Sequence, residues 1–477
     1  MNELETEINK TFENEVYPRC DHCKNFNDCE RPQRDNEGIL FSICTSFYPL
    51  FDEKATHNEL ATHIMSKYDF KTMLDTHEIY YYDNGVYVPR GEELITKELE
   101  RVKNPCNKTF MNEVLNHIQN RTWVDRESFD KDPTLLTLEN GVLDIETMQL
   151  HEFSPNYLSL VKLPIEYDKD AKCETIEKFL SEIVAKEDVE TLYEIAGFLL
   201  LKPYFIHKAI MQIGETHSGK STYQKLLCAM IGEENISHVS IQDLLTNRFV
   251  RAELYGKMMN SYADLPNTAL KQTGLFKILT GEDKLSAEKK HRDPFEFENN
   301  AKLIFSCNEM PKTYDKGDAF FIRWIIINFP NRFDDKNPKT DKKLIEKLTI
   351  KEELSGFFNK ALARAKVLFE QEHFTNNPNV EEIREYYEKL SNPIYAFIND
   401  ICLQEDNAGI TKREFYDALM KYCEDKNLSK PTTTYTTQEM KRLRFEDGQR
   451  HDGSRIWKGI RLKTDEEKKE DKTLDEF

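Results

Sequence analysis

The fold is decided by the stretch from Lys208 to Thr222, KAIMQIGETHSGKST. Its apolar run, Ala209 to Ile213, predicts a buried strand, and the residues after Thr222 place apolar side chains at helical spacing. Between strand and helix stands the pattern of a phosphate-binding P-loop, which a chance match in a glycine-rich turn would not be expected to reproduce. We therefore predict that ATP binds the loop residues Gly214, Glu215, Thr216, His217, Ser218, Gly219, Lys220, Ser221 and Thr222.

Each part of this loop has a chemical reason. Glycines let backbone N–H groups surround a polyphosphate. Lys220 supplies a positive charge to the β- and γ-phosphates, and Ser221 is placed to ligate Mg²⁺.

Length and composition indicate a multidomain protein that stays inside the cell. The 477 residues suffice for about three domains, and 39% of them are hydrophobic. No stretch is apolar enough to span a membrane, and the acidic N-terminus is unlike a signal peptide. The formal net charge of -19 argues against coating of nucleic acid by the whole surface, but it is compatible with basic strips in a channel.

Cysteines crowd the first tenth of the chain. Four thiolates, two of them in a Cys-x2-Cys half-site, suit tetrahedral zinc and leave no open coordination position, so we predict a structural zinc site. Four free cysteines, an iron–sulfur cluster and a site using His22 are the alternatives. The predicted zinc ligands are Cys20, Cys23, Cys29 and Cys44, whereas the other six cysteines are expected to be reduced core thiols.

Two later segments predict strands that end in a polar side chain. The segment Leu254 to Asp264 ends in an acid, which a P-loop fold needs at the tip of a neighbouring strand to hold the metal through water. The segment Ala301 to Asn308 ends in an amide that can orient the attacking water. Lys220, Asp264 and Asn308 are thus predicted catalytic residues, with Ser221 and Asp264 serving Mg²⁺.

Arg323 is the fourth predicted catalytic residue. It precedes the strand predicted at Ile325 to Ile327. In a ring-shaped ATPase such an arginine reaches the γ-phosphate held by the neighbouring subunit. An arginine that pairs with an acid inside its own subunit is the alternative, and spacing does not distinguish the two.

The segment Asp283 to Phe297 predicts a hairpin with a basic tip. In the channel of a ring, Lys289, Lys290 and His291 would grip the phosphates of one DNA strand. The alternative is a solvated surface turn, but the position between the ATPase strands favours DNA contact.

The remaining regions are predicted from periodicity. From Lys67 to Asp168 two hairpins, Glu78 to Val88 and Leu135 to Ile145, indicate an α+β region, in which the Tyr80 to Tyr82 run is expected to pack rather than stack on bases. Helical spacing dominates from Cys173 to Lys202.

After the break at Asn392-Pro393, three helices and a basic strand indicate a winged helix, with a protein-docking domain as the alternative. The predicted contacts to duplex phosphates, on its third helix, are Lys441, Arg442 and Arg444.

The chain resembles the superfamily 3 DNA helicases, in particular the helicase half of phage, plasmid and poxvirus primase-helicases. The stretches that carry this resemblance, from about Lys67 to Leu462, include ENGVLDIET, GETHSGKST, LYGKMMNSYADLPN, AKLIFSCNEMP and DAFFIRWIIINFP. The resemblance implies an AAA+-like α/β ATPase core, a homo-hexameric ring and movement on single-stranded DNA, typically 3′ to 5′.

By the same resemblance, Asn308 is the sensor residue, Arg323 is the trans-acting arginine finger, and Lys289, Lys290 and His291 lie on the channel hairpin. One departure concerns Asp264. Many relatives have two adjacent acids there, whereas here Ala263 and Leu265 flank it, so the residue that activates the water stays open.

The predicted organisation is therefore a zinc-binding segment (1–60), an α+β domain (61–200), the ATPase domain (201–390), a winged-helix domain (391–462) and a disordered tail (463–477). The tail ends in DKTLDEF, which resembles a sliding-clamp peptide without its glutamine and makes the host clamp a candidate partner.

We expect an ATP- and Mg²⁺-dependent replicative helicase of a mobile element or virus, acting on single-stranded and forked DNA in the host cytoplasm or nucleoid. The about fifty residues before the resemblance begins are too few for a primase domain, so we expect a separate primase or polymerase to act beside it. Two alternatives remain: an origin-binding initiator or loader that uses ATP as an assembly switch, and a P-loop ATPase that acts on RNA or protein.

Overall fold

The computed structural model describes residues 55–464 and Glu467, apart from gaps at 104–105, 203, 267, 271–272, 291–292, 334–340, 426–427, 429 and 451. The four cysteines predicted to bind zinc, His291 and the end of the tail lie outside these residues. Two compact units are found, one of residues 1–132 and 151–160, the other of residues 133–150 and 161–477. None of the described helices has the length and apolar character that a membrane crossing requires.

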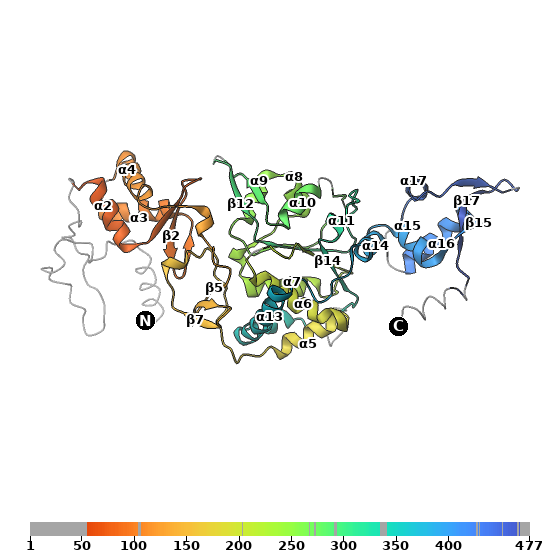
Figure 1. The fold of residues 1–477 in the computed structure, drawn as a ribbon, viewed down its shortest axis with the longest axis horizontal. Helices are drawn as coiled ribbons and strands as arrows, with labels where there is room; N and C mark the ends of the chain where they lie inside the picture. Colours follow the sequence, from red (N-terminus) through yellow and green to blue (C-terminus); the bar gives the residue numbers. More distant parts are fainter. Residues whose placement is uncertain are drawn as a thin grey trace, which may run out of the picture. The chain divides into compact units, whose positions relative to one another are not determined.

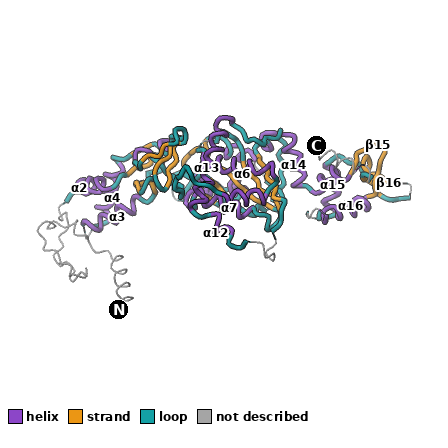
Figure 2. Tube along the Cα trace, turned by 90° about the horizontal axis from the view of Figure 1, so that it is seen from below, coloured by secondary structure: helices purple, strands orange, loops and turns teal. Residues whose placement is uncertain are grey.

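In the described residues of the first unit, helices α2, α3 and α4 (Figure 2) accompany a four-stranded sheet of order β3-β2-β1-β4. The first predicted hairpin is confirmed: Asp83 pairs with Val86, and the turn residues Asn84 and Gly85 have φ angles of 45° and 104°, as a type I′ turn requires. Tyr80 is buried, in agreement with packing. The elements are α2 (His57–Lys67), β1 (Phe70–Met73), β2 (Ile79–Asp83), β3 (Val86–Val88), α3 (Gly91–Val102), α4 (Lys108–Gln119), β4 (Trp123–Val124), η2 (Arg126–Ser128) and η3 (Pro155–Tyr157).

The second unit begins with a small sheet and continues into a larger parallel one. The second predicted hairpin is confirmed, because Leu138 pairs with Gly141. Before the large sheet come β5 (Leu135–Leu138), β6 (Gly141–Asp144), β7 (Gln149–His151), α5 (Glu174–Ile183), η4 (Lys186–Asp188) and α6 (Val189–Leu200).

The large sheet has five strands in the order β14-β8-β13-β10-β9, and all four pairings are parallel. A parallel sheet is buried on both faces, which explains why its strands read as apolar runs. The predicted mixed α/β fold with a parallel sheet is confirmed at this level. The strands are β8 (Ala209–Gly214), β9 (Ile236–Ser237), β10 (Met259–Tyr262), β13 (Lys302–Cys307) and β14 (Trp324–Phe329).

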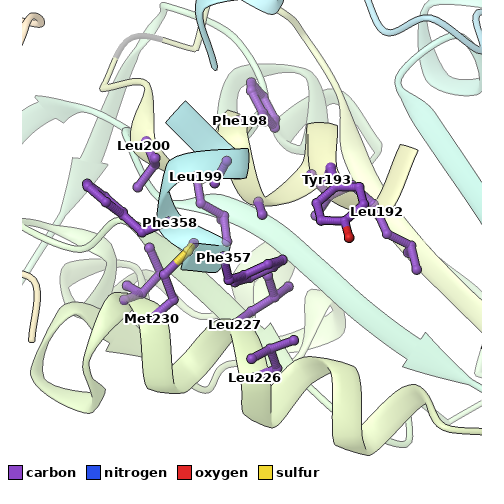
Figure 3. Packing of buried hydrophobic residues seen from close by; sticks show 14 of the residues in the cluster. Leu192, Tyr193, Phe198, Leu199, Leu200, Leu226, Leu227, Met230, Phe357 and Phe358 are labelled. Carbon is purple, nitrogen blue, oxygen red and sulfur yellow. The ribbon is translucent and has the colours of Figure 1, made fainter. Parts of the chain in front are cut away.

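Helices cover both faces of this sheet (Figure 1). On one face α6, α7 (Lys220–Ile231) and α13 (Lys351–Gln371) share a core with Ile210 of β8, and Figure 3 shows their interdigitated side chains. On the other face the neighbouring residue Met211 packs towards α8 (Ile241–Thr246), α10 (Thr273–Leu279) and α14 (Val380–Ser391). Shorter elements are η5 (Glu233–Asn235), α9 (Arg248–Arg251), η6 (Ala252–Leu254), β11 (Lys284–Ala287), β12 (Phe295–Glu298), α11 (Asp318–Phe321) and α12 (Leu344–Leu348).

The C-terminal part has three helices and a three-stranded antiparallel sheet of order β15-β17-β16. The sequence predicted only one of these strands, because β15 carries mostly exposed polar residues and β16 is short. The elements are α15 (Pro393–Ile401), β15 (Cys402–Thr411), α16 (Lys412–Asp425), α17 (Thr433–Arg442), β16 (Asp447–Gln449) and β17 (Arg455–Leu462).

All six scattered cysteines are unpaired, and Cys173, Cys307, Cys402 and Cys423 are buried as expected. Cys106 and Cys228 are partly exposed.

Candidate active site

The segment from Gly214 to Ser221, here called the 214–221 loop, joins β8 to α7 at the carboxyl edge of the parallel sheet. Strands β13 and β10 end at the same edge, since Cys307 pairs with Ile213 and Phe305 pairs with Tyr262. Parallel pairing therefore brings the residues that follow these strands, Asn308 and Asp264, beside the loop.

Two glycines allow the loop to close tightly. A Cβ on Gly214 would lie 2.6 Å from the Phe329 backbone oxygen, and one on Gly219 would lie 2.6 Å from Cγ2 of Ile183. Gly219 also has a left-handed φ of 100°, which side-chain-bearing residues rarely adopt. These positions hold glycine for reasons of space and backbone conformation.

Lys220 is fixed by hydrogen bonds across the loop. Its Nζ donates to the backbone oxygens of Gly214 at 2.5 Å and Glu215 at 2.8 Å, and to Asn308 Oδ1 at 3.3 Å. Burial lowers the pKa of the Lys220 ammonium, while nearby Cys307 and Asp264 partly offset this effect. The first residue of α7 is thus tied to the end of β13.

A cavity of about 680 Å³ lies over the loop. Its volume falls in the range of small-molecule sites. It brings together eight of the nine predicted loop residues with Asp264 and Asn308. The sequence analysis missed two further lining residues, Leu265 and Glu309. Glu309 could have been found, since an acid directly after the polar end of a strand is the same signal that identified Asp264.

The donors in this cavity fit Mg²⁺ only together with a substrate. Within the described residues, no group of three or more His, Cys, Asp or Glu side chains could hold a metal alone. Mg²⁺ is commonly bound by one or two carboxylates, water and substrate phosphates, and the cavity offers Asp264, Glu309 and the hydroxyl residue Ser221.

Arg323 lies at the opposite, amino edge of the sheet. It immediately precedes β14, whose first residue, Trp324, pairs with Ala209, the first residue of β8. Its Nη1 donates to the Ala319 backbone oxygen at 2.6 Å, and its Nε is buried without a hydrogen-bond partner. Burial lowers the pKa of the Arg323 guanidinium, and Asp283 opposes this effect. The length of β8 separates Arg323 from the cavity of its own chain.

The predicted basic hairpin is formed by β11 and β12, in which Lys284 pairs with Glu298 and Ala287 with Phe295. Lys290 is exposed at its tip, Lys289 is partly exposed, and His291 is not described. Arg248 of α9 forms an ion pair with Glu288 at 2.9 Å. The hairpin precedes β13 in the chain and therefore leads into the amino edge of the sheet.

Two family models match the chain. Residues 50–185 match the family described as "D5 N terminal like", and residues 212–323 match a family of unknown function, DUF5906. The second match covers the 214–221 loop from its first residue, as well as Asp264, Asn308 and Arg323.

The relatives include two viral proteins. "Putative helicase 121R" of Invertebrate iridescent virus 3 is 29% identical over 238 residues, which are 46% of this chain and 25% of that protein. "Putative helicase L207/L206" of Acanthamoeba polyphaga mimivirus is 24% identical over 277 residues, 52% of this chain and 27% of that protein. The chain thus matches about a quarter of the length of these curated relatives.

These matches support a likeness to the phage and viral primase-helicases. The resemblance inferred from its motifs is thereby confirmed. Solved structures of the NrS-1 C-terminal region are also similar: one is 13% identical, with a TM-score of 0.44, and covers 85% of this chain and 100% of its own. A second has 14% identity, a TM-score of 0.45 and coverage of 86% and 100%. TM-scores below 0.5 do not establish a common fold.

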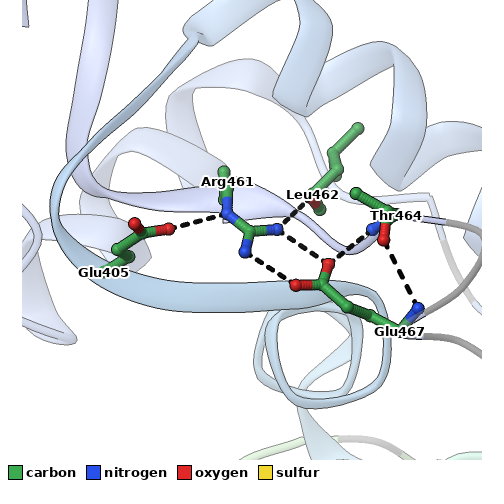
Figure 4. Close-up of polar contacts among 5 residues, drawn as sticks. All are labelled: Glu405, Arg461, Leu462, Thr464 and Glu467. Carbon is green, nitrogen blue, oxygen red and sulfur yellow. Dashed lines mark hydrogen bonds and ion pairs between the residues drawn. The ribbon is translucent and has the colours of Figure 1, made fainter. Parts of the chain in front are cut away.

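Of the three basic residues predicted on the third C-terminal helix, two are ion-paired, and Arg444 lies beyond the end of that helix, α17 (Thr433–Arg442). Lys441 lies 3.5 Å from Asp447, and Arg442 lies 2.6 Å from Glu439. Arg444 is exposed. Arg461 of β17 is also neutralised, between Glu405 and Glu467 at 2.7 Å each (Figure 4). The basic face of this part is therefore smaller than the sequence suggests.

Proposed function

We propose that the chain is an ATP-dependent replicative DNA helicase of a mobile element or virus. The observation that carries this proposal is the single cavity in which the 214–221 loop, Lys220, Asp264 and Asn308 meet. A glycine-bounded loop between strand and helix, a lysine at the helix start and polar residues at neighbouring strand ends are the parts that phosphoryl transfer needs.

In this proposal the loop is a P-loop of a superfamily 3, AAA+-like core. Its backbone N–H groups bind the β- and γ-phosphates of ATP, and Lys220 neutralises charge on them. Ser221 and Asp264 hold Mg²⁺, which neutralises developing charge when bound. Asn308 orients the attacking water, and Asp264 or Glu309 accepts its proton.

The position of Arg323 supports a ring. Because β8 lies between Arg323 and the cavity of its own chain, the arginine can serve phosphoryl transfer only at the cavity of another subunit. We therefore propose a homo-hexamer in which each Arg323 acts on the ATP of its neighbour. The β11–β12 hairpin then contacts single-stranded DNA through Lys289, Lys290 and His291, and movement runs 3′ to 5′.

We extend the proposal to the two ends of the chain. The C-terminal part acts as a winged helix on duplex DNA, and the exposed Arg444 is one of its contacts to phosphate. The four N-terminal cysteines bind structural zinc, the tail contacts the host clamp, and priming is left to a separate primase or polymerase.

The test is ATP hydrolysis by the purified chain with and without single-stranded DNA, combined with strand displacement on duplexes carrying a 3′ or a 5′ tail. We expect DNA-stimulated hydrolysis and unwinding from the 3′ tail. Unwinding only from a 5′ tail would reverse the polarity, and absence of hydrolysis would refute the proposal.

The C-terminal helices and sheet favour one second candidate, an origin-binding initiator or loader that uses ATP as an assembly switch. It predicts hydrolysis without unwinding on either tail. It also predicts a sharp preference for one duplex sequence, lost on deletion of residues 392–462.

A further inference from the structure

Lys208, the residue before β8, is buried in an unusual way. Only 8% of its surface is exposed, yet its ammonium has a single polar partner among the described residues, the Ile322 backbone oxygen at 2.6 Å. Burial lowers the pKa of this lysine to about 8. An aliphatic side chain would fill the same place without the cost of burying an ammonium group. The position of the ammonium therefore calls for an explanation beyond packing.

The carbonyl that Lys208 binds belongs to the turn that carries Arg323. The next residue along the chain, Ala209, donates its backbone N–H to the Arg323 backbone oxygen at 2.7 Å. Two consecutive residues at the start of β8 thus hold two consecutive carbonyls, those of Ile322 and Arg323. The backbone of Arg323 is fixed on both sides of its Cα atom.

The guanidinium itself is held much less. Arg323 makes one side-chain hydrogen bond, to the Ala319 backbone oxygen, and its Nε has no partner. Most of its donors are therefore left for another group. Where the guanidinium points is decided by the turn from Ile322 to Trp324, and the Lys208 ammonium is the only side-chain group that donates to the carbonyls of Ile322 and Arg323 within the described residues.

We propose that Lys208 is a positioning residue for Arg323. Its ammonium holds the Ile322 carbonyl so that the guanidinium projects from the amino edge of the sheet toward the ATP of the neighbouring subunit. This inference rests on the proposed function, in which Arg323 acts in trans. The proposal also gives β8 two roles: one end carries the loop that binds ATP in the same chain, and the other end supports the arginine that acts on the ATP of the neighbouring subunit.

The test uses Lys208→Met, which keeps the length of the side chain and removes its donor, and Lys208→Arg, which keeps a donor. We expect Lys208→Met to lower kcat for ATP hydrolysis about 100-fold, because a misplacement of a catalytic group by about 1 Å has an effect of this size. The KM for ATP should stay within about twofold of the wild-type value. Lys208→Arg should recover at least part of kcat.

Lys302→Met is the matched control. Lys302 is also a buried lysine at the start of a strand of this sheet, and it also donates to backbone oxygens, those of Lys202 and Asn300. These hydrogen bonds to described residues do not involve the Ile322–Arg323 turn, so the Lys302→Met variant should keep the wild-type kcat. Thermal melting identifies variants that fail to fold.

Mixing of subunits separates positioning from a general loss of structure. Subunits with Lys220→Ala have an intact Arg323 but an inactive nucleotide site. Subunits with Arg323→Ala have an intact nucleotide site but no arginine to act on their neighbour. Lys208→Met should regain hydrolysis when mixed with Lys220→Ala and should stay inactive when mixed with Arg323→Ala.

Each contrary result has a distinct meaning. Wild-type kcat in Lys208→Met, beside an inactive Arg323→Ala, overturns the inference and leaves the proposed function standing. Full hydrolysis by Arg323→Ala overturns the proposed role of the arginine itself. Recovery of Lys208→Met by Arg323→Ala subunits instead would show that Lys208 acts on its own nucleotide site and would end the inference.

Discussion

The two ends of β8 differ in how completely their polar groups are satisfied. At the carboxyl end, Lys220 donates to four groups within 3.3 Å around one cavity. At the amino end, Lys208 has one acceptor and Arg323 has a buried Nε with none. The first end gathers its polar groups around one cavity, and the second offers donors that the described residues of the same chain leave unused.

This difference suggests that the two edges of the sheet have different functions. The carboxyl edge gathers groups that act on a ligand of the same chain. The amino edge carries the arginine and leads into the β11–β12 hairpin, so it offers groups that fit other molecules. Five sets of variants test this comparison.

The largest effect is expected at the carboxyl edge. Lys220→Ala should reduce ATP hydrolysis to background, because no other lysine of the described part of the chain lines the cavity over the loop. Steady-state phosphate release measures this. Lys225→Ala, an exposed lysine on the same helix and outside the cavity, is the control and should keep wild-type activity.

At the amino edge, Arg323→Ala should lower kcat about 1000-fold with little change in ATP affinity, as expected for an arginine finger. Arg332 provides the contrast, since it stands beyond the carboxyl end of β14 and lies 3.6 Å from Glu215 of the loop. Arg332→Ala should change KM by no more than a few-fold and kcat hardly at all. Equal losses in the two variants would remove the distinction between the edges.

Variants of the two carboxylates of the cavity should differ in how their ATP hydrolysis depends on the Mg²⁺ concentration. We expect Glu309→Gln to lower kcat about 100-fold at unchanged Mg²⁺ requirement, if Glu309 accepts the proton of the water. Asp264→Asn should raise the Mg²⁺ concentration needed for half-maximal hydrolysis. Titration of Mg²⁺ at saturating ATP compares them, and the opposite pattern would exchange the two roles.

For the hairpin, Lys289→Ala/Lys290→Ala should keep basal hydrolysis and lose stimulation by single-stranded DNA. Each lost phosphate contact should reduce the slope of log affinity against log salt by about 0.7. Lys342→Ala/Lys343→Ala is a matched pair of adjacent, exposed lysines and should leave both quantities unchanged. Normal stimulation in the hairpin variant would contradict DNA contact at this edge.

The smallest effect concerns stability at the amino edge. Burial lowers the pKa of Lys302 to about 7 from 10.5, so the folded state binds fewer protons than the unfolded state between these values. Lys302 therefore makes folding less favourable as the pH falls from about 10 to 7. The difference in unfolding free energy between Lys302→Met and the wild type should therefore increase by on the order of 2 kcal/mol, in favour of the variant, when the pH is lowered from 9.5 to 7. Urea unfolding at the two pH values measures this, and a pH-independent difference would contradict it.

Local patterns in the sequence predicted much of the fold. The strand before the 214–221 loop, the Asn84-Gly85 turn and the buried face of α5 all depend on neighbours within one turn or one strand, so periodicity and turn chemistry could identify them. Strand β15 was not predicted, because its exposed polar residues show no alternation of apolar and polar side chains. Its position is set by pairing with β17, which lies far along the chain.

The sequence by itself determined which residue types serve the candidate site: a glycine-bounded loop with Lys220, and polar side chains at two strand ends. Only the tertiary structure decided which of them meet. Parallel pairing aligns the ends of β8, β10 and β13, and this places Glu309 in the cavity and Arg323 a full strand away from it. Strand order and direction arise from contacts between residues distant in the chain, and no local pattern records them.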